Sequence, residues 1–254
     1  MSKAVIGINP SANITKVSIL AGKIMLESGA ETHRVEDTMS RIAVAYGLEN
    51  VQCHATPTGI NFSVAFEEAT SFLRISNRST DLHKISAVND VSRNIAEGKC
   101  DVDEAFKQLK AIEQADLAFP SWVQILFAAL VSGSFTIMFG GIWFDYIPAF
   151  ITGGIGFSAM LAIYHLVEIR FVADFGASFV IGMLAFIFIQ TGYGVELDSI
   201  IIGSVMPLVP GLLITNAVRD LLAGHLIAGV SRGVEALLTA FAIGAGIAVF
   251  LAFV

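Results

Sequence analysis

The chain has 254 residues, a formal net charge of −7 and 55% hydrophobic residues. Lys and Arg do not outnumber Asp and Glu, so the composition gives no support to nucleic-acid binding. The two cysteines, Cys53 and Cys100, lie in a region that we expect to be cytoplasmic, so a structural disulfide is not predicted.

The composition changes near residue 120. Residues 1–120 hold 12 of the 15 Lys and Arg residues and have the composition of a soluble domain. Residues 121–254 contain apolar runs of about 20 residues, the length that crosses roughly 30 Å of hydrocarbon. We therefore predict a cytoplasmic domain at 1–120 and a transmembrane domain at 121–254. The first residues show no apolar core followed by a cleavage site, so no signal peptide is predicted.

Residues 1–120 show the mixture of helical and strand patterns that is typical of an α+β domain. Apolar residues recur at helical spacing in four stretches and alternate with polar residues in three short stretches between them. The short turns predict an antiparallel meander, and Asp101 with Glu104 predicts a capped helix start. The predicted helices are 14–28, 32–46, 82–96 and one that starts at Asp101, and the predicted strands are 51–56, 60–66 and 71–76.

One polar motif of this domain lies on the second predicted helix. His33, Glu36 and Asp37 fall on the side opposite the apolar stripe, and His54 follows on the first strand. Three interpretations stay open: a solvated polar face, a hydrogen-bond network, and a hydrolase or metal site. The motif lacks HExxH or CxxC spacing, so no metal is predicted. The candidate residues of the domain are Glu31, His33, Arg34, Glu36, Asp37 and the turn residues Thr56, Pro57, Thr58 and Gly59.

Apolar stretches follow residue 120, and the positions of Lys and Arg predict how these stretches are oriented in the membrane. We predict membrane spans at 121–140, 147–167, 171–191, 198–218 and 233–254. Every Lys and Arg lies before the first span or in the second and fourth connections, which places the N-terminus in the cytoplasm and the C-terminus outside. The predicted fold class is an α-helical polytopic membrane protein with five transmembrane helices, preceded by a small α+β domain with a three-stranded antiparallel sheet.

Two further features of the spans concern packing and charge. Small residues gather in the second, third and fifth spans and predict close helix packing, with faces available to another membrane helix. Arg170 and Asp174 lie one helical turn apart and are predicted to form an ion pair at the cytoplasmic edge.

The stretch 199–235 is the most informative part of the membrane half. It is apolar enough to enter a bilayer, yet Pro207 and Pro210 remove backbone donors and Gly211 adds freedom at the break. Broken helices near the bilayer midplane bind polar solutes in transporters. The other interpretation is a structural kink whose charges lie at the cytoplasmic surface, with apolar 221–230 in the interface or dipping back into the membrane. The candidate transport residues are Pro207, Pro210, Gly211, Asn216, Arg219, Asp220, Arg232 and Glu235.

Two stretches resemble the threonine/serine exporter family. They are SGAETHRVEDTMSRIAVAYG (28–47) with TPTGI (56–60), and MPLVPGLLITNAVRDLLAGHLIAGVSRGVEALLTA (206–240). The resemblance implies a cytoplasmic domain before five spans, secondary transport, and a further membrane half that is either fused or a separate small protein. The chain resembles the split form. The resemblance implies export of small hydrophilic metabolites, which are threonine and serine for some members and C4-dicarboxylates such as succinate for split members.

These observations predict the larger subunit of a two-component exporter of small hydrophilic metabolites in the cytoplasmic (inner) membrane. Arg219 or Arg232 would attract a solute carboxylate, and Asp220 or Glu235 would carry a coupling proton. The expected partners are the lipid bilayer, a small polar solute, a small membrane protein that supplies the second half, and further copies of the chain. No nucleic acid and no cofactor are expected.

Two alternatives to transport stay open. One is a membrane-tethered hydrolase that uses His33, Asp37 and His54, although the chain has no GxSxG elbow. The other is a non-transporting scaffold or regulator of a membrane partner. The exporter is the favoured prediction, so the chain is not expected to be an enzyme.

Overall fold

The computed structural model describes residues 10–64, 70–116 and 119–253. The chain divides into two compact units, which are Met1–Ala118 with Thr215–Arg232, and Phe119–Ile214 with Gly233–Val254. The first unit thus includes a segment from the apolar half of the sequence. The boundary predicted at residue 120 concerns membrane insertion, which this division does not test, so it stays a prediction.

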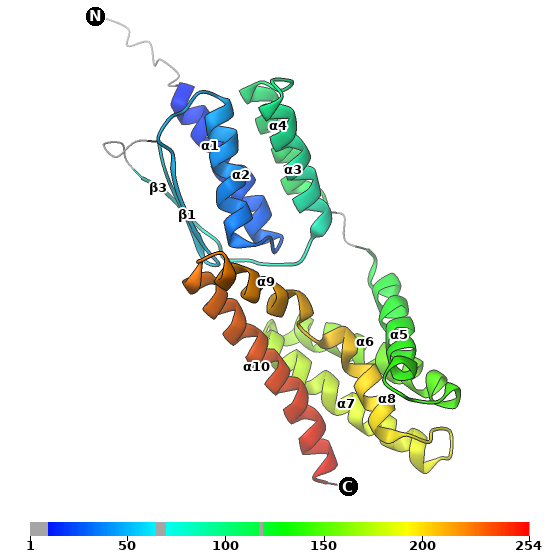
Figure 1. Cartoon of the computed structure of the whole chain (residues 1–254). Helices are drawn as coiled ribbons and strands as arrows, with labels where there is room; N and C mark the ends of the chain where they lie inside the picture. Colours follow the sequence, from blue (N-terminus) through cyan, green and yellow to red (C-terminus); the bar gives the residue numbers. More distant parts are fainter. Residues whose placement is uncertain (1–9, 65–69, 117–118, 254) are drawn as a thin grey trace, which may run out of the picture. The chain divides into compact units, whose positions relative to one another are not determined.

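Four helices of the first unit come from its N-terminal part (blue to green in Figure 1). They are α1 (Pro10–Glu27), α2 (Thr32–Ala45), α3 (Leu82–Ala96) and α4 (Val102–Gln114). The prediction placed α3 at the observed bounds, whereas α1 begins four residues earlier than predicted, at a proline, which the first helical position tolerates well. The Asp101 side chain accepts the Glu104 N–H at 2.8 Å, which confirms the predicted cap of α4.

The sheet of the first unit is the predicted antiparallel meander. Its strands are β1 (Gln52–Thr56), β2 (Gly59–Ser63) and β3 (Ser71–Arg74), in the order β1-β2-β3. Thr56 pairs with Gly59, so Pro57 and Thr58 form the tight turn that the sequence predicted. The predicted end of the second strand and the turn after it fall on residues 65–69, which lie outside the described residues.

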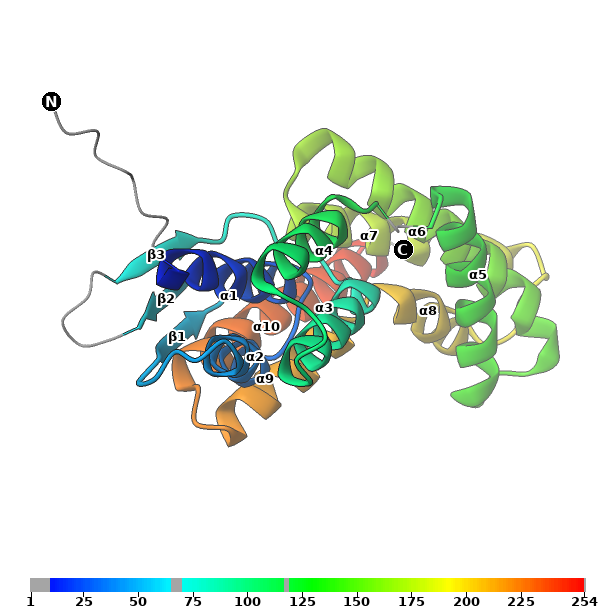
Figure 2. The same ribbon diagram turned by 90° about the horizontal axis from the view of Figure 1, so that it is seen from above.

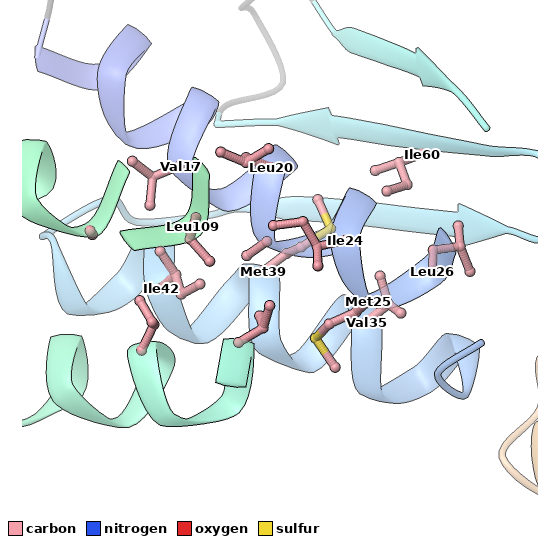
Figure 3. Packing of buried hydrophobic residues seen from close by; sticks show 14 of the residues in the cluster. Val17, Leu20, Ile24, Met25, Leu26, Val35, Met39, Ile42, Ile60 and Leu109 are labelled. Carbon is pink, nitrogen blue, oxygen red and sulfur yellow. The ribbon is translucent and has the colours of Figure 1, made fainter. Parts of the chain in front are cut away.

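The core of this unit lies around α1. Helix α1 packs against β2, α3 and α4, and α2 packs against β1 and α3; Figure 2 shows these elements from above. Figure 3 shows how Ile24 of α1, Met39 of α2 and Ile60 of β2 point toward one another, with Leu109 of α4 nearby. All four side chains are buried. This packing fixes the position of α2 within the first unit.

The second unit contains the apolar helices. Its elements are α5 (Ser121–Met138), η1 (Trp143–Asp145), α6 (Tyr146–Val167), α7 (Arg170–Gln190), α8 (Leu197–Val205), η2 (Met206–Leu208) and parts of α9 (Gly211–Leu222) and α10 (Leu226–Leu251). Among the described residues, four helices are long and apolar enough to cross a membrane, or five if the bent pair Leu197–Leu208 and Gly211–Leu222 forms one span. Five spans therefore stay a prediction.

Small residues bring these helices close together. A Cβ built on Gly203 of α8 would lie 2.7 Å from the Ser132 carbonyl oxygen of α5, so only glycine fits there. Gly153 of α6 lies against Ser132, and Gly182 of α7 lies against Phe250 of α10. The close packing predicted for the second and third spans is thus present. These two positions are occupied within the unit, so the prediction that they are free for another helix is wrong.

The last connection is much shorter than predicted. The predicted spans left residues 219–232 between them, whereas α9 continues to Leu222 and α10 begins at Leu226. Gly224 has a φ of 87°, the left-handed conformation that lets a tight turn separate two helices. Most of the segment is therefore helical, and its depth in the membrane stays a prediction.

Candidate functional site

The site is centred on Asp220, which is fully buried within the first unit. Its Oδ1 accepts the Thr32 N–H at 2.8 Å, and its Oδ2 accepts the Thr32 hydroxyl at 3.1 Å. Thr32 is the first residue of α2, and the N-cap residue Glu31 supplies no side-chain cap. Because the first N–H groups of a helix lack partners and favour negative charge, Asp220 of α9 caps α2.

Arg232 of α10 completes the buried pair. Its Nη1 lies 3.1 Å from the Asp220 Oδ2, and its Nη2 donates to the Ala30 carbonyl oxygen at 2.7 Å. Burying an ion pair is costly unless additional hydrogen bonds support it, and here Thr32 donates to Asp220 while Arg232 donates to Ala30. The Asp220 and Arg232 side chains therefore hold the start of α2 and the loop before it.

Two further polar contacts lie at the edge of the Asp220–Arg232 pair. Arg219 Nη1 lies 2.5 Å from Glu31 Oε1, and Asn216 Nδ2 donates to the Gly29 carbonyl oxygen at 2.9 Å. Burial opposes ionisation of Glu31, but its backbone hydrogen bond, Arg219 and the nearby Arg34 together hold its pKa below the ordinary value.

We call the whole group the Asp220 cluster. It consists of Gly29, Ala30, Glu31, Thr32, Asn216, Arg219, Asp220 and Arg232.

The polar motif of α2 lies beside this cluster. Glu36 accepts the Ala55 N–H at 2.7 Å, and both His54 and His225 place Nδ1 3.7 Å from its Oε1. His33 Nδ1 lies 3.9 Å from Asp220 Oδ1. Of the three interpretations left open by the sequence, these contacts favour a network within the unit.

The same contacts weaken the hydrolase alternative. Asp37 forms an ion pair with Arg41 on the surface, His33 lies beside Asp220, and His54 lies beside Glu36. Each of the three proposed catalytic side chains thus has a different partner. Across the described residues, no group of three or more His, Cys, Asp or Glu side chains is arranged to hold a metal ion.

The turn residues lie in the hairpin of the sheet. The Thr56 hydroxyl donates to the Gly59 carbonyl oxygen at 3.3 Å, and the Thr58 carbonyl oxygen accepts the Ile75 N–H at 2.9 Å. Pro57 lies between the two threonines in the turn. These contacts stabilise the hairpin, and no role in transport follows from them.

The helix break lies where the prolines predicted it. Pro207 is in η2, Pro210 precedes α9, and the two apolar segments are bent by 61°. The Pro210 carbonyl oxygen accepts the Ile214 N–H at 3.1 Å, so the new helix starts directly after the proline. Gly211 is its first residue. The break is confirmed, whereas its role in solute binding stays a prediction.

The structure brings some of the predicted transport residues together and leaves others apart. Asn216, Arg219, Asp220 and Arg232 meet the loop before α2, while Glu235 lies farther along α10 in the second unit. Sequence reasoning missed the roles of Thr32 and His225. Both lie inside the two stretches that carry the family resemblance, which was the available signal.

Comparisons with known proteins agree with the transporter prediction. The family profile described as "Putative threonine/serine exporter" matches residues 16–254. The chain is 26% identical to the "Probable succinate transporter subunit YjjP" of Escherichia coli (strain K12) over 245 residues, which cover 94% of this chain and 93% of that protein. No solved structure shows a significant match.

Longer relatives match over about half of their length. The chain is 24% identical to the "Threonine/serine exporter" of Corynebacterium glutamicum, over 93% of this chain and 50% of that protein. It is 23% identical to the "Probable threonine/serine exporter" of Mycobacterium tuberculosis, over 94% of this chain and 46% of that protein.

A family of exporters also agrees with the prediction that the chain is not an enzyme. The profile covers far more than half of the sequence, so the chain belongs to the threonine/serine exporter family of membrane transporters.

Proposed function

We propose that this chain is one subunit of a two-component secondary exporter of small hydrophilic metabolites in the cytoplasmic membrane. The solutes would be amino acids of the threonine and serine type, or C4-dicarboxylates such as succinate. The match to a relative named as a transporter subunit, over 93% of that relative, supports the two-component arrangement.

The proposed topology has five spans, with residues 1–120 in the cytoplasm and the C-terminus outside. It counts the bent pair Leu197–Leu208 and Gly211–Leu222 as one span. The positive charges of Arg170, Arg219 and Arg232 would then all lie on the cytoplasmic side, as the distribution of basic residues requires.

The observation that carries the proposal is the bend in this apolar pair. Pro207 and Pro210 lack N–H donors, so the break leaves carbonyl oxygens without their usual helical partners. Such groups are tolerated in a membrane only where protein or a water-filled cavity surrounds them, and transporters use them to bind polar solutes. We place the solute at this break.

Arg219 is better suited than Arg232 to attract a solute carboxylate. The Arg219 side chain is 58% exposed and meets only the edge of the Asp220 cluster. Arg232 is enclosed by Asp220 and the Ala30 carbonyl oxygen. We therefore assign the anion-attracting role to Arg219 and a structural role to Arg232.

A face of α10 would receive the partner subunit. Ala240, Gly244 and Ala248 are spaced four residues apart and are exposed within the second unit. A Cβ built on Gly244 meets no atom within 4 Å. Membrane helices approach closely along such small-residue faces, so another helix would fit here.

Solute efflux from vesicles tests the proposal. Proteoliposomes would contain this chain, a small membrane protein that co-purifies with it, or both, loaded with labelled succinate or threonine. We expect efflux only from vesicles that contain both proteins. Full efflux with this chain alone would contradict the two-component arrangement, and no efflux of any tested solute with both would contradict the exporter.

A further inference from the structure

Three aspartates of the described chain are fully buried, and they differ in their partners. Asp145 accepts the Val195 N–H at 2.7 Å, and Asp220 accepts two hydrogen bonds from Thr32. Asp174 of α7 is equally buried, yet within the described residues neither of its carboxylate oxygens has a hydrogen-bond partner. Asp145 and Asp220 therefore have an evident structural role, and the side chain of Asp174 has none.

Among the described residues, the Asp174 carboxylate has no hydrogen-bond donor and one cation beside it. Ala173 and Ala177 on the same helix are fully buried, and the Ser178 hydroxyl donates to the Asp174 backbone oxygen rather than to its carboxylate. Arg170 Nε lies 3.6 Å from Asp174 Oδ2, which confirms the predicted pair but is too long for a hydrogen bond. The Arg170 side chain is 54% exposed, so this pair does not satisfy the carboxylate.

Other titratable groups lie on the elements that pack against α7. They are Tyr146, Tyr164 and His165 of α6, Glu168 after it, Asp198 of α8, and Arg232 and Glu235 of α10. Within the described part of the chain, Arg170 is the one cation at ion-pair distance from Asp174.

An unsatisfied carboxylate in a membrane helix is costly when charged, and protonation removes that cost. The side chain has no exposed surface, so a polar solute has no room beside it, whereas protonation requires only brief contact with one water molecule. We propose that Asp174 is the residue that takes up and releases the proton coupled to solute export. This inference rests on the proposed transport function. The coupling proton is therefore placed on Asp174 and not on Asp220 or Glu235. Both carboxylate oxygens of Asp220 already accept hydrogen bonds from Thr32.

The step is a simple protonation. One Asp174 carboxylate oxygen gains a proton delivered by water from one side of the membrane and becomes a neutral carboxyl group. Arg170 then loses its electrostatic partner, and its exposed guanidinium remains solvated. Return of the proton to water on the other side restores the carboxylate and the pair with Arg170.

Asp174→Asn tests the proposal, because asparagine imitates the neutral carboxyl group in size. The variant would be reconstituted with the partner subunit, and Asp198→Asn, at an exposed position of α8, is the matched control. We expect Asp174→Asn to retain exchange of labelled for unlabelled solute but to lose about tenfold or more of the net export driven by a pH gradient. The control should behave like the unmodified protein.

Two outcomes at normal protein abundance would overturn the assignment. One is undiminished gradient-driven export by Asp174→Asn, which would place the proton elsewhere. The other is loss of exchange as well as net export, which would make Asp174 a solute-binding residue.

A spectroscopic measurement remains decisive if the variant folds poorly. Infrared difference spectra of the unmodified protein between high and low pH should show a protonated carboxyl band, and the Asp174→Glu variant should shift it. An unmodified protein whose spectrum lacks that band, or whose band Asp174→Glu leaves in place, contradicts the inference. If the unmodified pair of subunits moves no solute, the transport proposal fails, while the spectrum still reports on Asp174.

Discussion

Asp220 performs two tasks with one carboxylate. It accepts the first N–H of α2, and it neutralises the buried guanidinium of Arg232. Either group alone would be costly to bury without a partner. The loop before α2 is thereby tied to α9 and α10 through a small number of specific contacts.

Removing this carboxylate should destabilise the first unit strongly. Asp220→Ala removes the carboxylate that pairs with the buried Arg232 guanidinium and accepts the Thr32 N–H, so we expect a loss of about 3–5 kcal/mol in unfolding free energy. Asp220→Asn keeps one acceptor oxygen and should lose less. Chemical unfolding of the purified chain in detergent measures both, and Asp37→Ala at an exposed ion pair should change stability by no more than about 0.5 kcal/mol. Equal effects of Asp220→Ala and Asp37→Ala would refute the role of Asp220.

Glu31 should make stability depend on acidity. Its pKa in the folded chain lies below the ordinary value, so the folded state gains from ionised Glu31 once the pH is above the pKa of the unfolded chain, about 4.3. This contribution is lost as the pH falls below that range. The stability difference between the unmodified chain and Glu31→Gln should therefore shrink between roughly pH 5 and pH 3. A difference that stays constant over this range would contradict the effect.

At the scale of elements, local pattern predicted much of the structure. Periodicity and turn chemistry predict the bounds of α3, the cap at Asp101 and the turn at Pro57. Each of these features depends on residues that lie close together in the sequence. The contact of Thr32 with Asp220 joins residues 188 positions apart. No periodicity within one helix encodes such a contact, so the two motifs were found separately and their meeting was not predicted.

The continuation of α9 and α10 was missed for a related reason. The charges of Arg219 and Arg232 predict the ends of two membrane spans. Because these charges are paired within the first unit, α9 continues past Arg219 to Leu222, and α10 begins at Leu226, before Arg232. Burial with a partner removes the cost that usually ends an apolar helix at a charge.

The bend between α8 and α9 yields a prediction for the prolines. Pro207→Ala with Pro210→Ala restores two backbone donors and allows a straighter helix, and a proline in a helix interior costs roughly 3 kcal/mol. We expect the double variant to be at least as stable as the unmodified chain but to export far less solute in the vesicle assay. Normal export at normal abundance would make the bend a packing detail and move the solute site elsewhere.

At the scale of the whole molecule, orientation in the membrane is the first property to establish. All basic residues after residue 120 lie in the predicted cytoplasmic connections. A reporter fused after Val254 should therefore be active on the outer side, and one fused before Met1 should be active in the cytoplasm. If reporters at both ends are active in the cytoplasm, the chain crosses the membrane an even number of times. That result would contradict the five-span topology.

The cap on α2 also sets an order of events during synthesis. Thr32 leaves the ribosome 188 residues before Asp220 does. At 5–20 residues per second this separation lasts about 10–40 s, during which α5 to α8 are made. Throughout that interval the start of α2 lacks its acceptor, and the first unit is incomplete until Arg232 has followed. Completion of the N-terminal unit is thus tied to production of the apolar helices, so a nascent chain that stalls among them exposes an unfinished domain to the proteases of the cell.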